Sequence, residues 1–218
     1  MRNITISEGE YYHIFNRGMA KQAIFTTDRD RVRFLFSILY FQSSHTFRNT
    51  DFYTTNFSKY GYFDNGKTSR TVCSDRNVEL VSFCLMPNHF HLLMKEKTEG
   101  GIARYMQRVQ NSYTKYFNIK YKKSGHLFQG PYRAVHVADN EQLLHLSAYI
   151  HRNPIELART DEHSVFISKY KWSSLQDYVN INRWGELLEQ QIILGQFKGQ
   201  TEYSAFIKTS TTKEFAHN

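Results

Sequence analysis

Two histidines, His89 and His91, are separated by a single residue in an otherwise apolar segment. Because side chains alternate along a β-strand, both imidazoles should point to one face of a sheet, while Phe90, Leu92 and Met94 point to the other. Two imidazoles held on a rigid strand can bind one divalent metal ion. The pattern is more often that of an exposed histidine pair, so by itself it does not identify a metal.

A tyrosine and an asparagine four residues apart make a second candidate pair. Tyr149 and Asn153 fall at the end of a predicted amphipathic helix, where residues four apart lie one turn above the other. The phenol oxygen can attack a phosphorus atom, and the amide oxygen can bind the same metal ion as the imidazoles. In the alternative interpretation Tyr149 only packs, and Asn153, which precedes Pro154, only ends the helix.

The third feature is a basic region. The chain has 28 Lys and Arg against 20 Asp and Glu, a net charge of +8, and no acidic residue occurs between Gly100 and Ala138. Aromatic residues alternate with the cations there. Such surfaces attract polyanions, and rings stack on unpaired bases, so single-stranded nucleic acid is the predicted ligand. A solvated basic face is the alternative.

The residues proposed to contact nucleic acid are sorted by whether they would contact base edges, phosphates or base faces, with one further cation. Asn16 and Arg17 follow the first predicted strand and can read a base edge. The others lie in the basic region: Arg104, Arg108 and Lys115 for phosphates, His126, Phe128 and Tyr132 for stacking on bases, and Arg133 as a further cation.

Length and composition narrow the class of protein. The 218 residues are 40% hydrophobic and 22% charged, which predicts one folded domain. Apolar runs are too short to span a bilayer, and no membrane partner is expected. The N-terminal segment lacks the apolar stretch of a secretion signal, and two cysteines cannot form a disulfide framework, so we expect a cytoplasmic protein.

Apolar periodicity predicts the elements that position these residues. Strands are expected over 11–15, 78–85, 89–94 and 133–137, and helices over 28–42, 101–120 and 140–152. The order strand–helix–strand–strand–helix–strand predicts an α+β fold, a ferredoxin-like antiparallel sheet with helices packed on one face. Residues 45–76 show no clear period and are predicted to be a structureless stretch, either an insertion or a mobile loop. Two further helices are predicted near 175–179 and 184–194.

Residues 61–68 match the P-loop pattern G-x-x-x-x-G-K-[ST]. That loop needs a buried strand before it and a helix that starts at its lysine. Neither is predicted around Lys67, and the sequence Asp64-Asn65-Gly66 is typical of a tight turn. We therefore reject nucleotide binding here.

Several segments resemble one family. The segment Met86–His91 resembles the His-hydrophobic-His motif of HUH single-tyrosine transposases, and Tyr149–Pro154 resembles the nucleophile helix of their REP-associated relatives. Segments 111–118, 125–133 and 170–174 also resemble that group. The resemblance covers about residues 9–180, with 45–76 as the main departure. It implies a transposase domain over 1–180 and a C-terminal helical extension over 181–218.

The resemblance implies a DNA strand transferase with Tyr149 as nucleophile. His89, His91 and Asn153 would hold Mg²⁺ or Mn²⁺. Insertion-sequence members often have Gln at the third position, and His145 or water can complete the shell around the shorter Asn153. The implied substrate is single-stranded DNA with hairpin ends, cut through a 5′-phosphotyrosine link by a monomer or a homodimer.

Two other functions remain open. A domesticated relative would bind hairpin DNA without cutting it. A plasmid relaxase or replication initiator shares the His-hydrophobic-His core but is usually longer. Because all the family positions hold chemically competent residues, we expect an active transposase.

Overall fold

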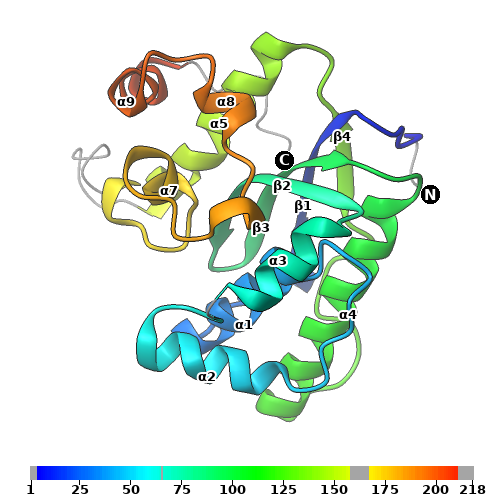
Figure 1. The fold of residues 1–218 in the computed structure, drawn as a ribbon. Helices are drawn as coiled ribbons and strands as arrows, with labels where there is room; N and C mark the ends of the chain where they lie inside the picture. Colours follow the sequence, from blue (N-terminus) through cyan, green and yellow to red (C-terminus); the bar gives the residue numbers. More distant parts are fainter. Residues whose placement is uncertain (1–3, 65, 158–166, 211–218) are drawn as a thin grey trace.

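A four-stranded antiparallel sheet with the spatial order β2-β3-β1-β4 forms the centre of the molecule (Figure 1). The computed structural model describes residues 4–64, 66–157 and 167–210. The strands are β1 (Tyr11–Arg17), β2 (Val78–Met86), β3 (His89–Glu96) and β4 (Arg133–His136). This is the strand order that a split βαβ unit produces, so the predicted ferredoxin-like α+β fold is confirmed.

The helices follow the predicted positions and add some that were not predicted. The α-helices are α1 (Asp28–Tyr40), α2 (Thr50–Tyr60), α3 (Lys67–Ser74), α4 (Gly101–Tyr121), α5 (Asn140–Arg152), α7 (Leu175–Val179), α8 (Gln191–Leu194) and α9 (Gln200–Thr209). Short 3₁₀ turns are η1 (Met19–Lys21), η2 (Asn153–Leu157) and η3 (Gly185–Leu187). Within the described residues, no helix is both long and apolar enough to cross a bilayer.

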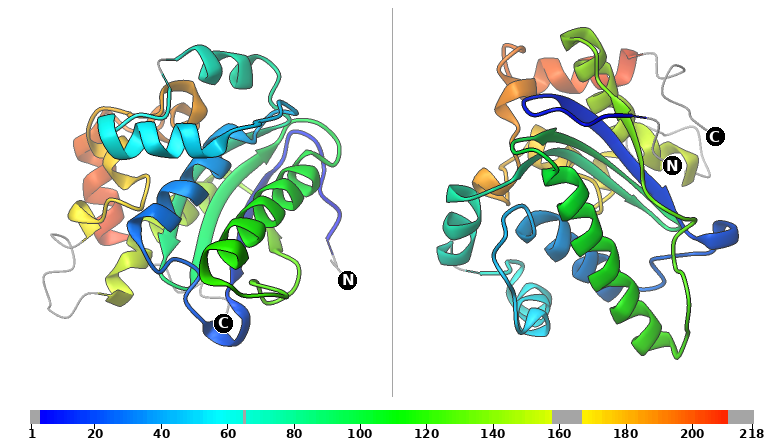
Figure 2. Two further views of the ribbon diagram at one scale, coloured as in Figure 1. Left: turned by 90° about the horizontal axis from the view of Figure 1, so that it is seen from below. Right: turned by 90° about the vertical axis from the view of Figure 1, so that its right-hand side faces the viewer.

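Helices α1 and α4 cover one face of the sheet and form the main core with it (Figure 2). Phe90 of β3 lies 5.0 Å, ring to ring, from Phe34 of α1, which lies 5.0 Å from Tyr113 of α4. Phe90, Leu92 and Met94 are fully buried, as the strand alternation predicts. Each such side chain contributes about 1.5–3 kcal/mol by leaving water.

Helix α5 covers the opposite face, along β2 and β3, so helices occupy both sides of the sheet, and the expected packing on one face alone is wrong (Figure 2). Its apolar side buries Leu143, Leu146 and Ile150. Behind it lies α9, where the hydroxyl of Tyr203 shares hydrogen bonds with Nδ1 of His151 at 2.8 Å and Oγ of Ser147 at 3.0 Å. These contacts hold α5 between the sheet and α9.

The prediction of a structureless stretch over residues 45–76 is wrong, because α2 and α3 lie there. Aromatic side chains from this segment pack on the core: Phe63 lies 5.4 Å from Phe36 of α1 and 5.9 Å from Trp184. Asn49 caps α2 by accepting a hydrogen bond from the backbone N–H of Phe52. The rings contact several sides at once, so no single helical period was visible in the sequence.

The P-loop match is still rejected, for a partly different reason. A helix does begin at Lys67, contrary to the sequence prediction, but helix α2 precedes the motif instead of a strand. The carboxylate of Asp64 accepts hydrogen bonds from the backbone N–H groups of Thr68 at 2.7 Å and Ser69 at 3.1 Å. The helix terminus that would bind phosphate is therefore filled by a side chain that repels it.

The C-terminal helices agree only in part with the sequence prediction. Helix α7 is confirmed, whereas the helix predicted over 184–194 is divided into η3 and α8, and α9 was not predicted. Since α9 packs against α5, part of the predicted extension 181–218 supports the helix that carries Tyr149. The boundary at residue 180 stays a prediction.

We expect Tyr203→Phe to destabilise the fold by about 1–3 kcal/mol, because the buried His151 Nδ1 and Ser147 Oγ lose a common partner. Urea unfolding followed by circular dichroism measures this free energy. Tyr60→Phe is the matched control, since Tyr60 is 61% exposed, and it should change stability by less than about 0.5 kcal/mol. Equal stability of the two variants would contradict the role given to Tyr203.

Candidate active site

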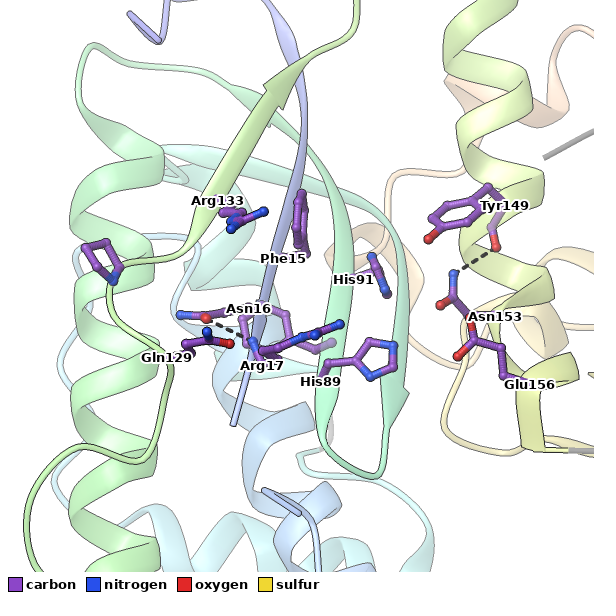
Figure 3. Close-up of a pocket in the computed structure, with 12 residues that line it drawn as sticks. Phe15, Asn16, Arg17, His89, His91, Gln129, Arg133, Tyr149, Asn153 and Glu156 are labelled. Carbon is purple, nitrogen blue, oxygen red and sulfur yellow. Dashed lines mark hydrogen bonds between the residues drawn. The ribbon is translucent and has the colours of Figure 1, made fainter. Parts of the chain in front are cut away.

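A cavity of about 270 Å³ opens between β3, the end of β1 and helix α5 (Figure 3). Its wall residues come from four parts of the chain, within 15–17, 89–91, 129–133 and 149–156. The polar side chains that line it are Asn16, Arg17, His89, His91, Gln129, Arg133, Tyr149, Asn153 and Glu156. The nucleophile and the three metal ligands that the sequence suggested are therefore brought to one place.

The first imidazole is held in one protonation form by its neighbours. Nδ1 of His89 lies 2.7 Å from Oδ1 of Asn88. The amide of Asn88 is oriented by a hydrogen bond from its Nδ2 to the carbonyl of Lys21 at 3.1 Å. Because Oδ1 can only accept, Nδ1 of neutral His89 carries the hydrogen and Nε2 keeps a lone pair.

The second imidazole is oriented by a third histidine. Nδ1 of His91 forms a hydrogen bond of 2.8 Å with Nε2 of His13 on β1, and the two rings stack with centroids 5.0 Å apart. This contact leaves Nε2 of His91 as the ring nitrogen available to a ligand. Outer partners of this kind fix the orientation of metal-binding imidazoles.

Burial keeps both rings neutral. It lowers the pKa of His89 to about 4, against a smaller opposing effect of Asn153, and the charge of Arg17 lowers it further. Burial is also the largest cause that lowers the pKa of His91 well below its usual value. Electrostatic interaction with His13, His89 and Arg17 lowers it further. Neutral imidazoles are the form that binds metal ions.

Tyr149 lies beside the histidines. Its ring centroid is 5.6 Å from that of His91 at an interplanar angle of 85°, and 5.9 Å from that of His13. Figure 3 shows Tyr149 pointing from α5 toward His91 on β3. Burial raises the pKa of Tyr149, opposed by Asn153 and reinforced by the carboxylate of Glu156. The phenol is therefore protonated at neutral pH and needs a positive charge nearby to lose its proton.

Asn153 supplies an oxygen to the same space. It is 5% exposed, and its Nδ2 donates to the carbonyl of Tyr149 at 3.1 Å. Oδ1 is buried and has no hydrogen-bond partner among the residues that the structure describes. An unpaired buried oxygen costs about 1–3 kcal/mol, a cost that a bound cation would remove.

The donor set fits a divalent cation. Two imidazole nitrogens and one amide oxygen border the cavity, and such ligands suit Mn²⁺ and, less strongly, Mg²⁺. Over 4–64, 66–157 and 167–210, no three His, Cys, Asp or Glu side chains lie close enough to hold a metal ion. A site here therefore depends on Asn153 as its third ligand.

His145, the alternative ligand, points away from the cavity. Its Nδ1 lies 2.7 Å from Oγ of Ser210, and its ring packs 5.1 Å from Phe206 of α9. It lies on the outer side of α5 and cannot complete a shell around His89 and His91.

The side chains of Asn16 and Arg17 differ in what they contact. Arg17 pairs with His89 across β1 and β3, so its side chain lies on the histidine side of the sheet. Asn16 is 6% exposed; its Nδ2 donates to the carbonyl of Gly130 at 3.1 Å, and its Oδ1 accepts from the N–H of Arg17 at 2.8 Å. The nitrogen and the oxygen of the Asn16 side-chain amide are therefore both used within the protein, which corrects the base-reading role predicted for this residue.

The stacking roles predicted for Phe128 and Tyr132 are also corrected. Phe128 is 6% exposed and Tyr132 is 3% exposed, so neither ring offers a face to a base. Phe128 packs instead 6.0 Å from Phe90 and 6.4 Å from Tyr113. Ring size and apolarity indicate burial as readily as stacking, and only the tertiary structure distinguishes the two.

The predicted cations have different surroundings. Arg108 donates to the carbonyls of Phe41, Ser43 and His45, so it holds the connection after α1 and is not available as the predicted phosphate ligand. Arg104 is exposed at the start of α4. Arg133 is exposed at the cavity wall, and Lys115 and His126 line a separate groove. Roles for these four stay predictions.

Sequence reasoning missed His13, Gln129 and Glu156. Glu156 lies in η2, beyond the end of the predicted helix at residue 152, so helical spacing from Tyr149 did not indicate its position. His13 could be connected to His91 only after the pairing of β1 with β3 was known.

A family model agrees with the resemblance found in the sequence. Residues 61–153 match the family model described as IS200-like transposase, a segment that includes both histidines, the tyrosine and the asparagine. A solved structure of a REP-associated tyrosine transposase bound to a REP hairpin is 15% identical, covers 82% of this chain and 84% of that chain, and has a TM-score of 0.49. A search of curated proteins finds no match.

We expect His89 to stay neutral in the metal-free protein down to about pH 4, with the hydrogen on Nδ1. Nitrogen-15 NMR of the imidazole reports both features. Between about pH 6.5 and 4 the unfolded chain takes up a proton that the fold excludes, so His89 makes the fold less stable as the pH falls. Asn88→Ala should remove the preference for Nδ1–H; a ring protonated at pH 6 in the wild type would contradict the assignment.

Proposed function

We propose that the protein cuts and rejoins single-stranded DNA bearing a hairpin, because residues 61–153 match the model of the IS200-like transposase family. The observation that carries the proposal is the position of Tyr149 on α5 beside His91 on β3, with Asn153 in the same cavity. One chain supplies all these groups, which supports activity without a second copy.

Tyr149 is the proposed nucleophile. Its hydroxyl oxygen attacks the scissile phosphorus, a bond from phosphorus to the tyrosine oxygen forms, and the bond to the 3′ oxygen breaks. The proton of the phenol ends on the released 3′ oxygen. The products are a 5′-phosphotyrosine and a free 3′-hydroxyl, and no water is consumed. The energy of the phosphodiester is kept, so the reverse attack can rejoin the strand.

His89 and His91 through Nε2, and Asn153 through Oδ1, would hold Mg²⁺ or Mn²⁺. A divalent ion with three neutral ligands keeps its full charge and polarises a non-bridging phosphate oxygen when it is bound. Asn88 and His13 hold the imidazoles in position for this task. Their orientation is set before substrate binds, which limits the reorganisation that catalysis requires.

Arg17 is the proposed phosphate ligand. Its guanidinium lies near enough to His89 and His91 to lower the pKa of both, so its charge acts inside the cavity. A fixed cation next to the phosphate binds the substrate and stabilises the negative charge on its oxygens. This role replaces the base-edge contact predicted for Arg17.

We expect a covalent protein–DNA adduct when labelled, hairpin-bearing single strands from the flanks of the gene are incubated with the protein and Mn²⁺. Tyr149→Phe should form no adduct on a denaturing gel yet bind the DNA with unchanged affinity. Tyr60→Phe, in an exposed tyrosine, is the control and should react as the wild type does. Tight binding without any adduct in the wild type would favour a domesticated hairpin-binding protein.

Metal binding can be tested without measuring cleavage. Electron paramagnetic resonance should detect Mn²⁺ bound to the wild type, and His91→Ala should abolish this signal. His13→Ala, which removes an outer partner, should weaken Mn²⁺ binding about 10–100-fold. His136→Ala serves as the control, because that ring pairs with Glu10 at the surface. Unchanged Mn²⁺ affinity in His91→Ala would place the metal elsewhere.

A further inference from the structure

A second hollow of about 590 Å³ lies between α4 and the segment 126–131. The α4 side is lined by Gln110, Asn111, Thr114, Lys115 and Asn118. Segment 126–131 forms the other side, and it includes the exposed His126. The proposed cleavage reaction does not use this groove.

The groove and the active-site cavity share a wall. Pro131 borders both. The shared segment is held against the end of β1 by the hydrogen bond from Asn16 to the carbonyl of Gly130, and by one from the N–H of Gln129 to the carbonyl of Arg17 at 2.9 Å. A strand bound in the cavity can therefore continue across Pro131 without leaving the surface.

The side chains of the groove differ from those of a phosphate-binding surface. Three of the five α4 residues are carboxamides, although Nδ2 of Asn118 already donates to the carbonyl of Gly125 at 3.0 Å; one is a hydroxyl, and only Lys115 carries a full charge. No Asp or Glu occurs among the lining residues that the structure describes. Carboxamides both donate and accept hydrogen bonds, as base edges do, whereas a phosphate offers only acceptors.

Gln110 adds an observation that points to a ligand. Its Nε2 is buried and has no hydrogen-bond partner among the described residues. An unpaired buried donor costs about 1–3 kcal/mol, which an acceptor on a bound molecule would recover. Asn111, next to it, is exposed and offers a complete amide to a ligand.

We propose that this groove binds one or two bases of the single strand that leaves the active-site cavity and reads their edges with Gln110 and Asn111. The inference rests on the proposed function, because that function supplies the strand. The volume falls within the range of about 300–1,000 Å³ that is usual for small-ligand sites. Carboxamides pair best with adenine, so adenine is the expected preference, and Lys115 binds the adjoining phosphate.

The test is a binding selection. A library of hairpin DNA with eight randomised nucleotides on each side is bound to the full chain in EDTA, which prevents metal-assisted cleavage, and the bound strands are sequenced. The wild type should enrich adenine at one or two positions. The double variant Gln110→Ala/Asn111→Ala should lose about 5- to 150-fold of that preference at those positions only.

Two single variants complete the experiment. Gln107→Ala is the matched control, because Gln107 is an exposed carboxamide on α4 outside the groove, and it should keep the wild-type preference. Lys115→Ala should weaken binding to all sequences alike and lower the slope of log affinity against log salt by about 1. Thermal unfolding midpoints confirm that the variants are folded.

Several outcomes would overturn the inference. A double variant with the wild-type base preference would show that the groove reads no base. Equal loss of affinity at every position would show contact with the DNA backbone only. A wild type that binds none of the library would refute the groove and the proposed function together. Base preference lost in the double variant, with no covalent adduct in Mn²⁺, would refute strand transfer while supporting the groove.

Discussion

The antiparallel pairing of β1 with β3 is the constraint on which the candidate site depends. Its register places Phe15 opposite His91 and Arg17 opposite His89, and so sets a cation beside the imidazoles. The same pairing brings His13 to Nδ1 of His91. A slip of one residue would move the β1 side chains to the other face of the sheet. Burial of Tyr12 and Ile14, which lie opposite Met94 and Leu92 on the α1 side, opposes such a slip.

Burial under α5 has opposite effects on the two kinds of proposed catalytic group. It lowers the pKa of His89 and His91, which favours the neutral form that binds a metal ion. It raises the pKa of Tyr149, which opposes the anionic form that attacks phosphorus. Loss of the Tyr149 proton therefore needs positive charge in the cavity, which the proposed metal ion would supply.

The basic region shows why charge counted along a sequence overstates the charge available to DNA. Arg108 is bound by three backbone carbonyls, and Lys120 forms an ion pair of 2.5 Å with the buried Asp30. Both cations stabilise contacts of α1 with α4. Lys115 stays at the surface, in a groove rich in carboxamides, where base recognition is better supported than a continuous phosphate track.

The sequence by itself determined the features that depend on neighbouring residues: strand alternation put His89 and His91 on one face, and helical spacing put Tyr149 one turn before Asn153. It also predicted the order of strands and helices that leads to the fold. Only the tertiary structure decided the helices within 45–76, the burial of Phe128 and Tyr132, and the contact of His13 with His91. These depend on which distant surfaces meet, and a local pattern of apolar and polar residues does not carry that information.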